Sequence, residues 1–165
     1  SRWLIQETNE KGGIWMGAKP TLVILMGIQG SGKSTFYHQY LSDMIHVNLD
    51  TLHTRHREGQ LVSDCLLNRR SFAVDNTNPT KADRERYISA AKAHDFYIIG
   101  YFMESKLQEC IARNNLRSGK ARIPAAAIAA TSNKLELPDF AEGFDELYFV
   151  ANDGKKMTIS EWRED

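Results

Sequence analysis

The chain has 165 residues, of which 42% are hydrophobic and 25% are charged, a composition typical of one ordinary globular domain. No run approaches the roughly 18–20 consecutive apolar residues of a membrane-spanning helix and no secretory leader is visible, so we expect a cytoplasmic protein with no membrane partner. The formal net charge is zero, but residues 136–165 carry nine acidic and three basic side chains, against 12 acidic and 18 basic in the first 135. The basic first part suits a polyanionic substrate, and it suits a nucleotide alone equally well.

Residues 1–19 are polar, with two tryptophans and a Gly-Gly pair, and we predict a lead-in arm or linker there, followed by a single domain over 20–165. A first residue of Ser rather than Met is expected of a processed or excised fragment. The two cysteines form no CxxC pair and the five histidines lack metal-site spacing, so we expect ordinary thiols and no structural metal.

From residue 20 onward, apolar strand-like runs alternate with helical segments. We predict strands at 21–26, 46–49, 71–74, 96–102 and 146–150, and helices at about 33–42, from about 51, 60–69, 81–94, 106–117 and 124–135. This alternation indicates βαβ units, and hence an α/β fold with a five-stranded parallel sheet and helices on both faces. Ligands of such sheets bind beyond the carboxyl ends of the strands, so the segments that follow the first three strands should face one crevice.

The segment after the first strand carries the most specific motif of the chain. Residues 27–34 read GIQGSGKS, the G-x-x-x-x-G-K-[ST] pattern of a phosphate-binding loop, and they lie between a strand and a helix as that motif requires. Backbone N–H groups and the helix N-terminus would hold the phosphates, Lys33 would meet the β- and γ-phosphates, and Ser34 would bind Mg²⁺. The ATP-binding residues predicted here are Gly30, Ser31, Gly32, Lys33, Ser34 and Thr35.

Acidic residues follow the second and third strands. Asp50 in HVNLD precedes a helix, and the sequence leaves two roles even: a helix N-cap, or the general base that takes the proton of an acceptor hydroxyl. Asp75 opens the polar run DNTN (75–78), which is either a turn before Pro79 or part of the crevice. In the crevice, Asp75 would be a magnesium partner or an orienting acid.

Residues 110–122, CIARNNLRSGKAR, contain four basic side chains and no acidic one. Arg113 and Arg117 are four residues apart and would share one helix face, while Leu107 and Ile111 would mark the buried stripe. A solvated basic face is the commoner fate of such a run. The alternative is a lid whose guanidinium groups stabilise a transferring phosphoryl group.

Together these motifs resemble the kinase domain of the 5′-hydroxyl polynucleotide kinases, the phage and animal enzymes that heal DNA and RNA ends. The resemblance covers about residues 21–150 and rests on GIQGSGKST, HVNLDTL, AVDNTNP followed by a basic helix ending in RY, RNNLR and EGFDEL. It implies a P-loop kinase-type three-layer sandwich with a small lid, ATP or another nucleoside triphosphate as phosphate donor, Mg²⁺ as cofactor, and nucleic acid 5′-OH ends as acceptors. Family members are commonly fused to phosphatase, phosphoesterase or ligase domains, which would lie outside this chain.

The family pattern implies a role for each matching residue. Asp50 would be the general base, Lys33 and Arg117 would act on the transferred phosphoryl group, and Arg113 would bind ATP and support the lid. The residues implied to hold the acceptor are Asp50, Asp75, Asn76, Thr77 and Asn78.

Two positions depart from the pattern on the acceptor side. Leu49 stands where the family often has Arg, and His53 stands where the phage enzyme has Arg. Arg55 and Arg57 are candidates to replace them. The leading hypothesis is an ATP-dependent polynucleotide 5′-hydroxyl kinase of nucleic acid repair, and the alternative is a kinase of a small metabolite or nucleoside on the same fold. A nucleotide-gated binding module would leave Asp50 and the arginines without a task.

Overall fold

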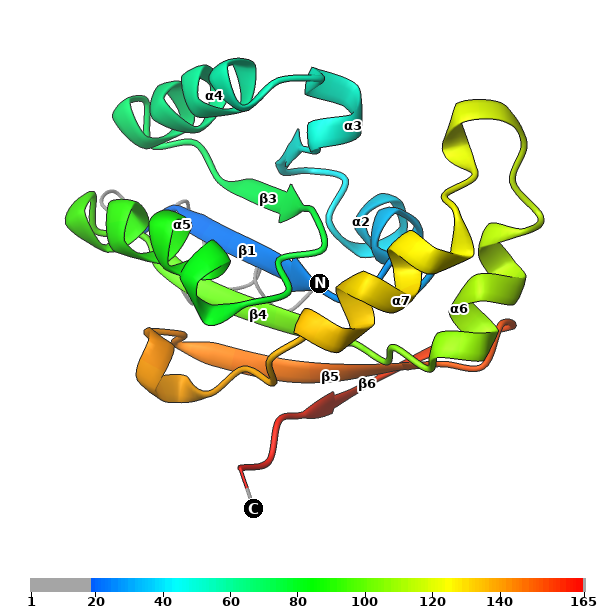
Figure 1. Ribbon diagram of the computed structural model, residues 1–165. Coiled ribbons are helices and arrows are strands. Elements are labelled where there is room, and N and C mark those ends of the chain that lie inside the picture. Colours follow the sequence, from blue (N-terminus) through cyan, green and yellow to red (C-terminus); the bar gives the residue numbers. More distant parts are fainter. Residues whose placement is uncertain (1–18, 165) are drawn as a thin grey trace.

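The computed structural model describes residues 19–164, so the arm predicted over residues 1–19 lies almost wholly outside the described residues. One sheet of six strands runs through the domain in the order β2-β3-β1-β4-β5-β6 (Figure 1). Its strands are β1 (Thr21–Met26), β2 (Ile45–Val47), β3 (Phe72–Asp75), β4 (Tyr97–Met103), β5 (Glu146–Asn152) and β6 (Met157–Glu161). The first five pair in parallel, which confirms the predicted α/β fold.

The prediction that the sheet closes at residue 150 is wrong. β5 continues to Asn152, and β6 then pairs with it antiparallel after a tight turn in which Asp153 accepts hydrogen bonds from the backbone N–H groups of Lys155 and Lys156. The sequence of β6, MTISE, escaped detection because an edge strand needs little apolar character, and four of its five residues are exposed.

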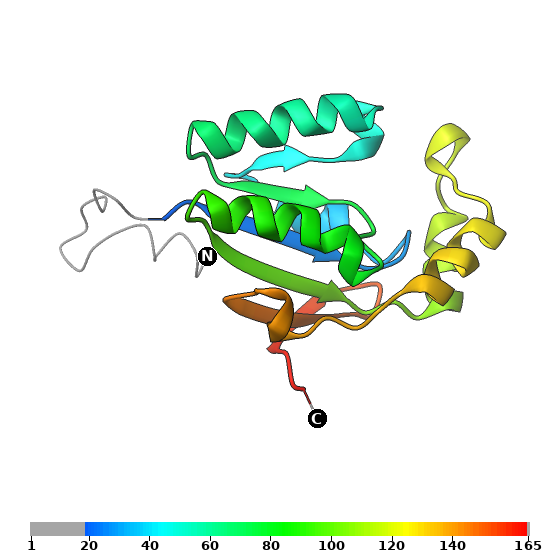
Figure 2. The same ribbon diagram turned by 60° about the vertical axis from the view of Figure 1, so that its left-hand side comes forward.

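Helices cover both faces of the sheet, as predicted: α4 and α5 lie over one face and α2 over the other (Figures 1 and 2). The helices are α2 (Lys33–Tyr40), α3 (Leu49–Leu52), α4 (Arg55–Leu67), α5 (Lys81–Ala93), α6 (Leu107–Asn114) and α7 (Ala125–Lys134). Several predicted bounds are wrong. The strand expected over 46–49 ends at Val47, because Asn48 caps the next helix and Leu49 already belongs to it. The helix expected from residue 51 is the single turn α3, with α4 starting at Arg55 rather than 60, and the helix expected over 106–117 ends at Asn114.

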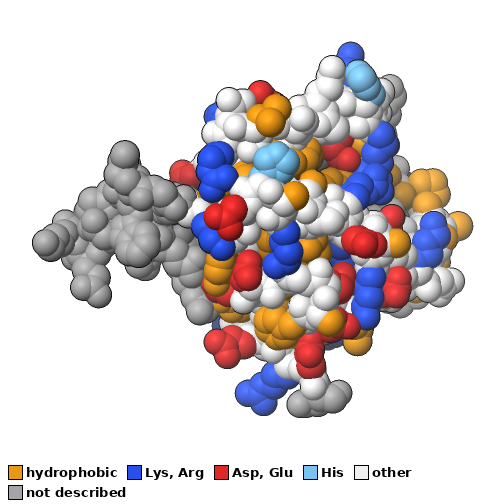
Figure 3. Space-filling view, turned by 90° about the vertical axis from the view of Figure 1, so that its left-hand side faces the viewer, with side chains coloured by type: hydrophobic (Ala, Val, Ile, Leu, Met, Phe, Trp, Pro, Cys, Tyr) orange, Lys and Arg blue, Asp and Glu red, His pale blue; other side chains and the backbone are white. Residues whose placement is uncertain are grey.

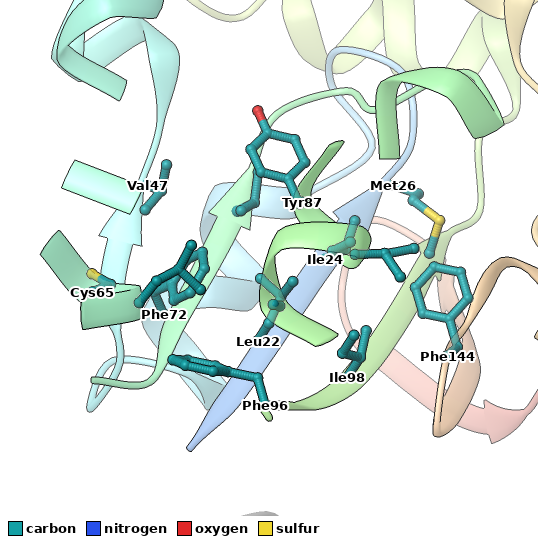
Figure 4. Close-up of a cluster of buried hydrophobic side chains, with 14 of the residues drawn as sticks. Leu22, Ile24, Met26, Val47, Cys65, Phe72, Tyr87, Phe96, Ile98 and Phe144 are labelled. Atoms are coloured by element: carbon teal, nitrogen blue, oxygen red, sulfur yellow. The ribbon is translucent and has the colours of Figure 1, made fainter. Parts of the chain in front are cut away.

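The central strand β1 divides the core into two halves. Leu22, Ile24 and Met26 are fully buried on the face covered by α4 and α5 (Figure 4), while Val23 and Leu25 are fully buried against α2. Each such side chain contributes roughly 1.5–3 kcal/mol through burial. The phosphate-binding loop therefore follows a strand whose six residues are all buried.

The two ends of the sheet differ in character. Figure 3 views the domain from the side on which the parallel strands begin, where Lys and Arg alternate with Asp and Glu and hydrophobic side chains appear only in small patches. The loops that follow the strands lie at the opposite end, with α6 and α7 (Figure 1). No helix within residues 19–164 has the length and apolar character to cross a bilayer.

Candidate phosphoryl-transfer site

The loop between β1 and α2 has the backbone conformation of an anion site. Gly30 has a φ of 81°, and a Cβ atom there would lie 2.4 Å from the carbonyl oxygen of Cys110. Gly32 has a φ of 100° and is the N-cap residue of α2. Only glycine fits at these two positions, because a side chain would be both strained and obstructed. The loop thus brings its backbone N–H groups close to the start of an eight-residue helix.

Lys33 lies buried at the centre of this loop. Its Nζ donates hydrogen bonds to the carbonyl oxygens of Gly27 (2.9 Å) and Ile28 (3.0 Å). Burial lowers the pKa of Lys33 to about 8; the nearby Asp75 and Asp50 carboxylates oppose this shift, and the Arg117 guanidinium adds to it. The charges of Asp75, Asp50 and Arg117 therefore all act on Lys33. Bound phosphate oxygens would raise this pKa again, because they favour the charged form.

Asp75, at the end of β3, joins the loop to the second strand. Its Oδ2 accepts hydrogen bonds from Ser34 Oγ (2.7 Å) and from His46 Nε2 (2.7 Å), and Tyr37 stacks on the His46 ring with centroids 3.8 Å apart. Burial alone would raise the pKa of Asp75, but these two hydrogen bonds and the charge of Lys33 outweigh it and hold the pKa below its ordinary value. A hydroxyl and an ionised carboxylate side by side fit Mg²⁺, which takes few protein oxygens when phosphates supply the rest.

Asp50 occupies the second position of α3 and is exposed. The N-cap role belongs to Asn48 instead, whose Oδ1 accepts a hydrogen bond from the N–H of Thr51 (3.1 Å). Of the two roles that the sequence left open for Asp50, N-cap and general base, the structure therefore excludes the N-cap. Within residues 19–164 the Asp50 carboxylate accepts no hydrogen bond, and its negative charge acts on Lys33.

The DNTN run forms more hydrogen bonds within the protein than the sequence indicated. Asn78 is buried and its Nδ2 donates to the carbonyl oxygen of Leu25 (2.8 Å), while the carbonyl oxygen of Thr77 accepts from the N–H of Gly27 (3.0 Å). The first contact ties the run to β1, and the second ties it to the phosphate-binding loop. The half-buried Thr77 side chain is the member of the run with no hydrogen bond among the described residues.

The two arginines of the predicted lid line the same pocket but are held differently. Arg113, on α6, donates from Nε to the carbonyl oxygen of Gly30 (2.7 Å), and so it clamps the phosphate-binding loop. Arg117 lies beyond the last residue of α6 and is exposed, so the predicted shared helix face is wrong. Both side chains nevertheless line the same pocket.

That pocket has a volume of about 390 Å³ and adjoins the phosphate-binding loop. It brings together α2, the lid and the β5–β6 turn, and it is lined by Gly30, Gly32, Thr35, Gln39, Tyr40, Arg113, Arg117, Asn152, Gly154, Lys155, Lys156 and Met157. Asn152 fixes the turn to the loop by donating from Nδ2 to the carbonyl oxygen of Ser31 (3.0 Å), and the Ser31 side chain itself is buried. The sequence did not predict the part of the pocket formed by the β5–β6 turn, because β6 was not predicted.

His46 was also missed, although a signal existed. His46 lies on β2 and Asn48, two residues later, continues its extended backbone, so the two side chains share one face. Both contact Asp75: His46 binds the carboxylate, and Asn48 donates to the carbonyl oxygen (2.8 Å). The proposed arginine substitutes differ from each other. Both are exposed, but the Arg55 side chain donates to Glu58 and Tyr87, whereas the Arg57 side chain has no hydrogen bond among the described residues.

Comparison with known proteins gives relatives over most of the chain, although no protein-family model matches it. A bifunctional polynucleotide phosphatase/kinase of Schizosaccharomyces pombe is 27% identical over 153 residues, which cover 87% of this chain and 37% of that protein. A protein of Acanthamoeba polyphaga mimivirus named for the same two activities is 27% identical over 140 residues, or 80% of this chain and 33% of the other. The Arabidopsis thaliana protein named transcription factor bHLH140 is 29% identical over 152 residues, 82% of this chain and 16% of its own length. The chain thus spans little more than a third of these relatives at most.

Solved structures place the fold. Chaetomium thermophilum Kti12 in complex with ADP-AlF3 has a TM-score of 0.64 at 16% identity, with 82% of this chain and 91% of that one covered. A gluconokinase from Sinorhizobium meliloti has a TM-score of 0.56 at 16% identity, with 80% and 82% covered. The described residues have the fold of the P-loop kinases.

Proposed function

We propose that this chain is a phosphotransferase, an ATP-dependent polynucleotide kinase that transfers the γ-phosphate to a 5′-hydroxyl end. The observation that carries the proposal is the exposed Asp50 carboxylate of α3, which accepts no hydrogen bond within residues 19–164 and whose charge acts on Lys33 of the phosphate-binding loop. An N-cap would have occupied that carboxylate. A nucleotide-binding module without transfer would have no need of it.

In this proposal the 390 Å³ pocket takes the donor nucleoside, with Lys155 and Lys156 at its rim. Lys33 and the loop N–H groups bind the β- and γ-phosphates, and Arg113 holds the loop in shape through Gly30. Ser34 and Asp75 would hold Mg²⁺, which neutralises charge on the β- and γ-phosphates when it is bound.

The transfer itself requires one proton acceptor and one in-line attack. Asp50 takes the proton of the acceptor hydroxyl, whose oxygen forms a bond to the γ-phosphorus as the bond from that phosphorus to the bridging oxygen of ADP breaks. Arg117 supplies positive charge to the transferring group from the lid. Asp50 later releases the proton to water.

Support for a nucleic acid acceptor comes from the motif set and from the two relatives named as polynucleotide phosphatase/kinases. Their names also favour an end-processing phosphatase encoded beside a kinase of this type. One observation favours the alternative of a small-molecule acceptor: the half-buried Leu49 leaves no cation at the position before Asp50. Arg55 is the exposed cation of α4 closest in sequence to this position, but it is paired with Glu58; Arg57 is the next one along α4.

The test is transfer of label from γ-labelled ATP, with Mg²⁺, to short single-stranded 5′-OH DNA and RNA oligonucleotides in parallel. Asp50→Asn is the matched control, because it keeps the size of the side chain and removes the base. We expect labelled 5′ ends, a loss of roughly 10²–10⁴-fold in the variant, and unchanged ATP binding. Transfer near the wild-type rate in Asp50→Asn would contradict the base assignment.

The alternative is separated by the acceptor. A polynucleotide kinase should lose efficiency when the 3′-phosphate of a mononucleotide acceptor is removed, and its KM for oligonucleotides should rise with salt. Labelling of sugars or nucleosides with no labelling of oligonucleotides would replace the proposal with the small-molecule kinase.

A further inference from the structure

The element that carries Asp50 cannot hold its own shape. α3 is a single turn of four residues, and helices this short are unstable by themselves in water. Two asparagine side chains fix it from outside. Asn48 caps it, and Asn76 Oδ1 accepts a hydrogen bond from the N–H of Leu49 (3.0 Å), the residue next to Asp50.

Asn76 can perform this task in only one orientation of its amide. If Oδ1 faces the Leu49 N–H, Nδ2 must face the other way and needs an acceptor. Glu58 Oε2 supplies it at 2.8 Å. A carboxylate accepts but does not donate, so it selects the orientation of Asn76 that α3 requires.

Glu58 is itself built into the fold. It lies on α4 with a side chain 4% exposed, and its Oε1 accepts from Tyr87 Oη (2.8 Å) and from Arg55 Nη1 (2.9 Å). A buried carboxylate is costly unless it is paired, and here three donors surround it. The chain could have placed an apolar residue there, which would have left the Asn76 amide free to turn.

We propose that Glu58 is a positioning residue for the catalytic base: it acts through Asn76 and the Leu49 N–H to hold Asp50 at the acceptor. The inference rests on the proposed function for the role of Asp50, and on the contacts alone for the order of α3. It also gives the second residue of DNTN an internal role in place of the predicted acceptor contact.

A double-mutant cycle with Glu58→Ala and Asn76→Ala tests the proposal, with kcat and KM for ATP measured in each variant. Each single change should lower kcat about 10²-fold, the loss expected from a misplacement of about 1 Å, while KM for ATP stays within about twofold. Because Glu58 acts through Asn76, the double variant should lose no more than Asn76→Ala alone. Tyr87→Phe is the matched control, since it removes a donor to Glu58 and the long contact from Asn76 Nδ2 to Tyr87 Oη (3.5 Å) but leaves the hydrogen bond between Asn76 and Glu58 (2.8 Å), and it should keep its kcat within about threefold.

Losses that multiply in the double variant, or a wild-type kcat in Glu58→Ala, would overturn the proposal. If Glu58→Ala does not fold, the exchanged pair Asn76→Asp with Glu58→Gln serves instead, because the new Asp accepts from the Leu49 N–H and the new Gln donates to that Asp. This pair should keep kcat within about tenfold of wild type, whereas a folded pair as slow as Asn76→Ala would contradict the proposal.

Hydrogen exchange of the α3 amides gives a readout that does not depend on any acceptor. Exchange at Leu49 should accelerate in Asn76→Ala and Glu58→Ala and not in Tyr87→Phe. If the wild-type protein phosphorylates no oligonucleotide, the proposed function fails, and the exchange pattern still decides whether Glu58 orders α3. Unchanged exchange in Glu58→Ala would overturn the inference whatever the acceptor.

Discussion

The donor side and the acceptor side of the site are held in place by different means. On the donor side, backbone conformation does the work: glycines with positive φ shape a loop that grows out of a fully buried strand. On the proposed acceptor side, one turn of helix carries the proposed base, and that turn is held by side chains just after β2 and β3 and by one on α4. A site formed by backbone conformation can be recognised in the sequence as a contiguous motif. The residues of a site held by side chains are instead scattered along the sequence.

The largest expected effect probes where the two sides meet. Arg117→Ala should lower kcat by roughly 10³-fold or more, because a lid arginine acts on the charge of the transferring group. The fold should be unaffected, since the side chain is exposed and forms no hydrogen bond within residues 19–164. Steady-state kinetics with Arg122→Ala as control measures this; Arg122 is also exposed, and it contacts Asn115. Equal losses in the two variants would make the effect one of general lid charge.

The next prediction concerns the donor side alone. The pKa of Lys33 is lowered to about 8, below its unfolded value, so between about pH 8 and pH 10.5 the unfolded chain binds more protons than the native one. Lys33 therefore destabilises the nucleotide-free protein at pH 7, on the order of 3 kcal/mol at most, and this penalty disappears as the pH rises through that window. Denaturant unfolding of wild type and Lys33→Met from pH 7 to pH 11 should show a stability difference that shifts steadily toward the wild type. A pH-independent difference would mean that Lys33 titrates normally.

On the acceptor side, Asn48→Ala should separate turnover from ATP binding. Asn48 caps α3 and also donates to Asp75, so its loss should cost about 1 kcal/mol of stability and about 10²-fold in kcat. ATP affinity should stay unchanged, because the phosphate-binding loop has its own support. Asn68→Ala is the control, as Asn68 caps α4 on the exposed surface. A parallel loss of ATP affinity would show that the two sides are not independent.

The smallest effect is a gain in stability. His53 ends α3 with a φ of 72°, a conformation that costs a non-glycine residue roughly 1–3 kcal/mol. His53→Gly should raise the thermal midpoint by an amount equivalent to about 1 kcal/mol, whereas His53→Ala should not, because alanine keeps the Cβ atom. Thermal unfolding of the two variants decides this, and equal midpoints would argue against strain at the end of α3.

The contrast between contiguous motifs and scattered side chains also explains how much of the molecule could be predicted from the sequence. The α/β fold, the first five strands and the phosphate-binding loop could be predicted because continuous apolar runs and fixed spacings specify them. Asp50 could be located, but its freedom from the N-cap role depends on Asn48, and the order of its helix depends on Asn76 and Glu58, which lie 26 and 8 residues away from it in the sequence. No local pattern marks Glu58 as buried. β6 was missed because an exposed edge strand has no apolar signature, and the wall of the donor pocket was missed with it.

The reversal of direction at β6 has a practical consequence for the way the domain can be handled. β1 begins, and the antiparallel β6 ends, at the side of the sheet away from the phosphate-binding loop. An affinity tag, a fluorophore or a surface tether joined next to either strand would leave from the mixed-charge side seen in Figure 3. Immobilised protein should therefore keep the phosphate-binding loop and its pocket open to solvent, which suits the domain to single-molecule tests of the proposed binding of oligonucleotide ends.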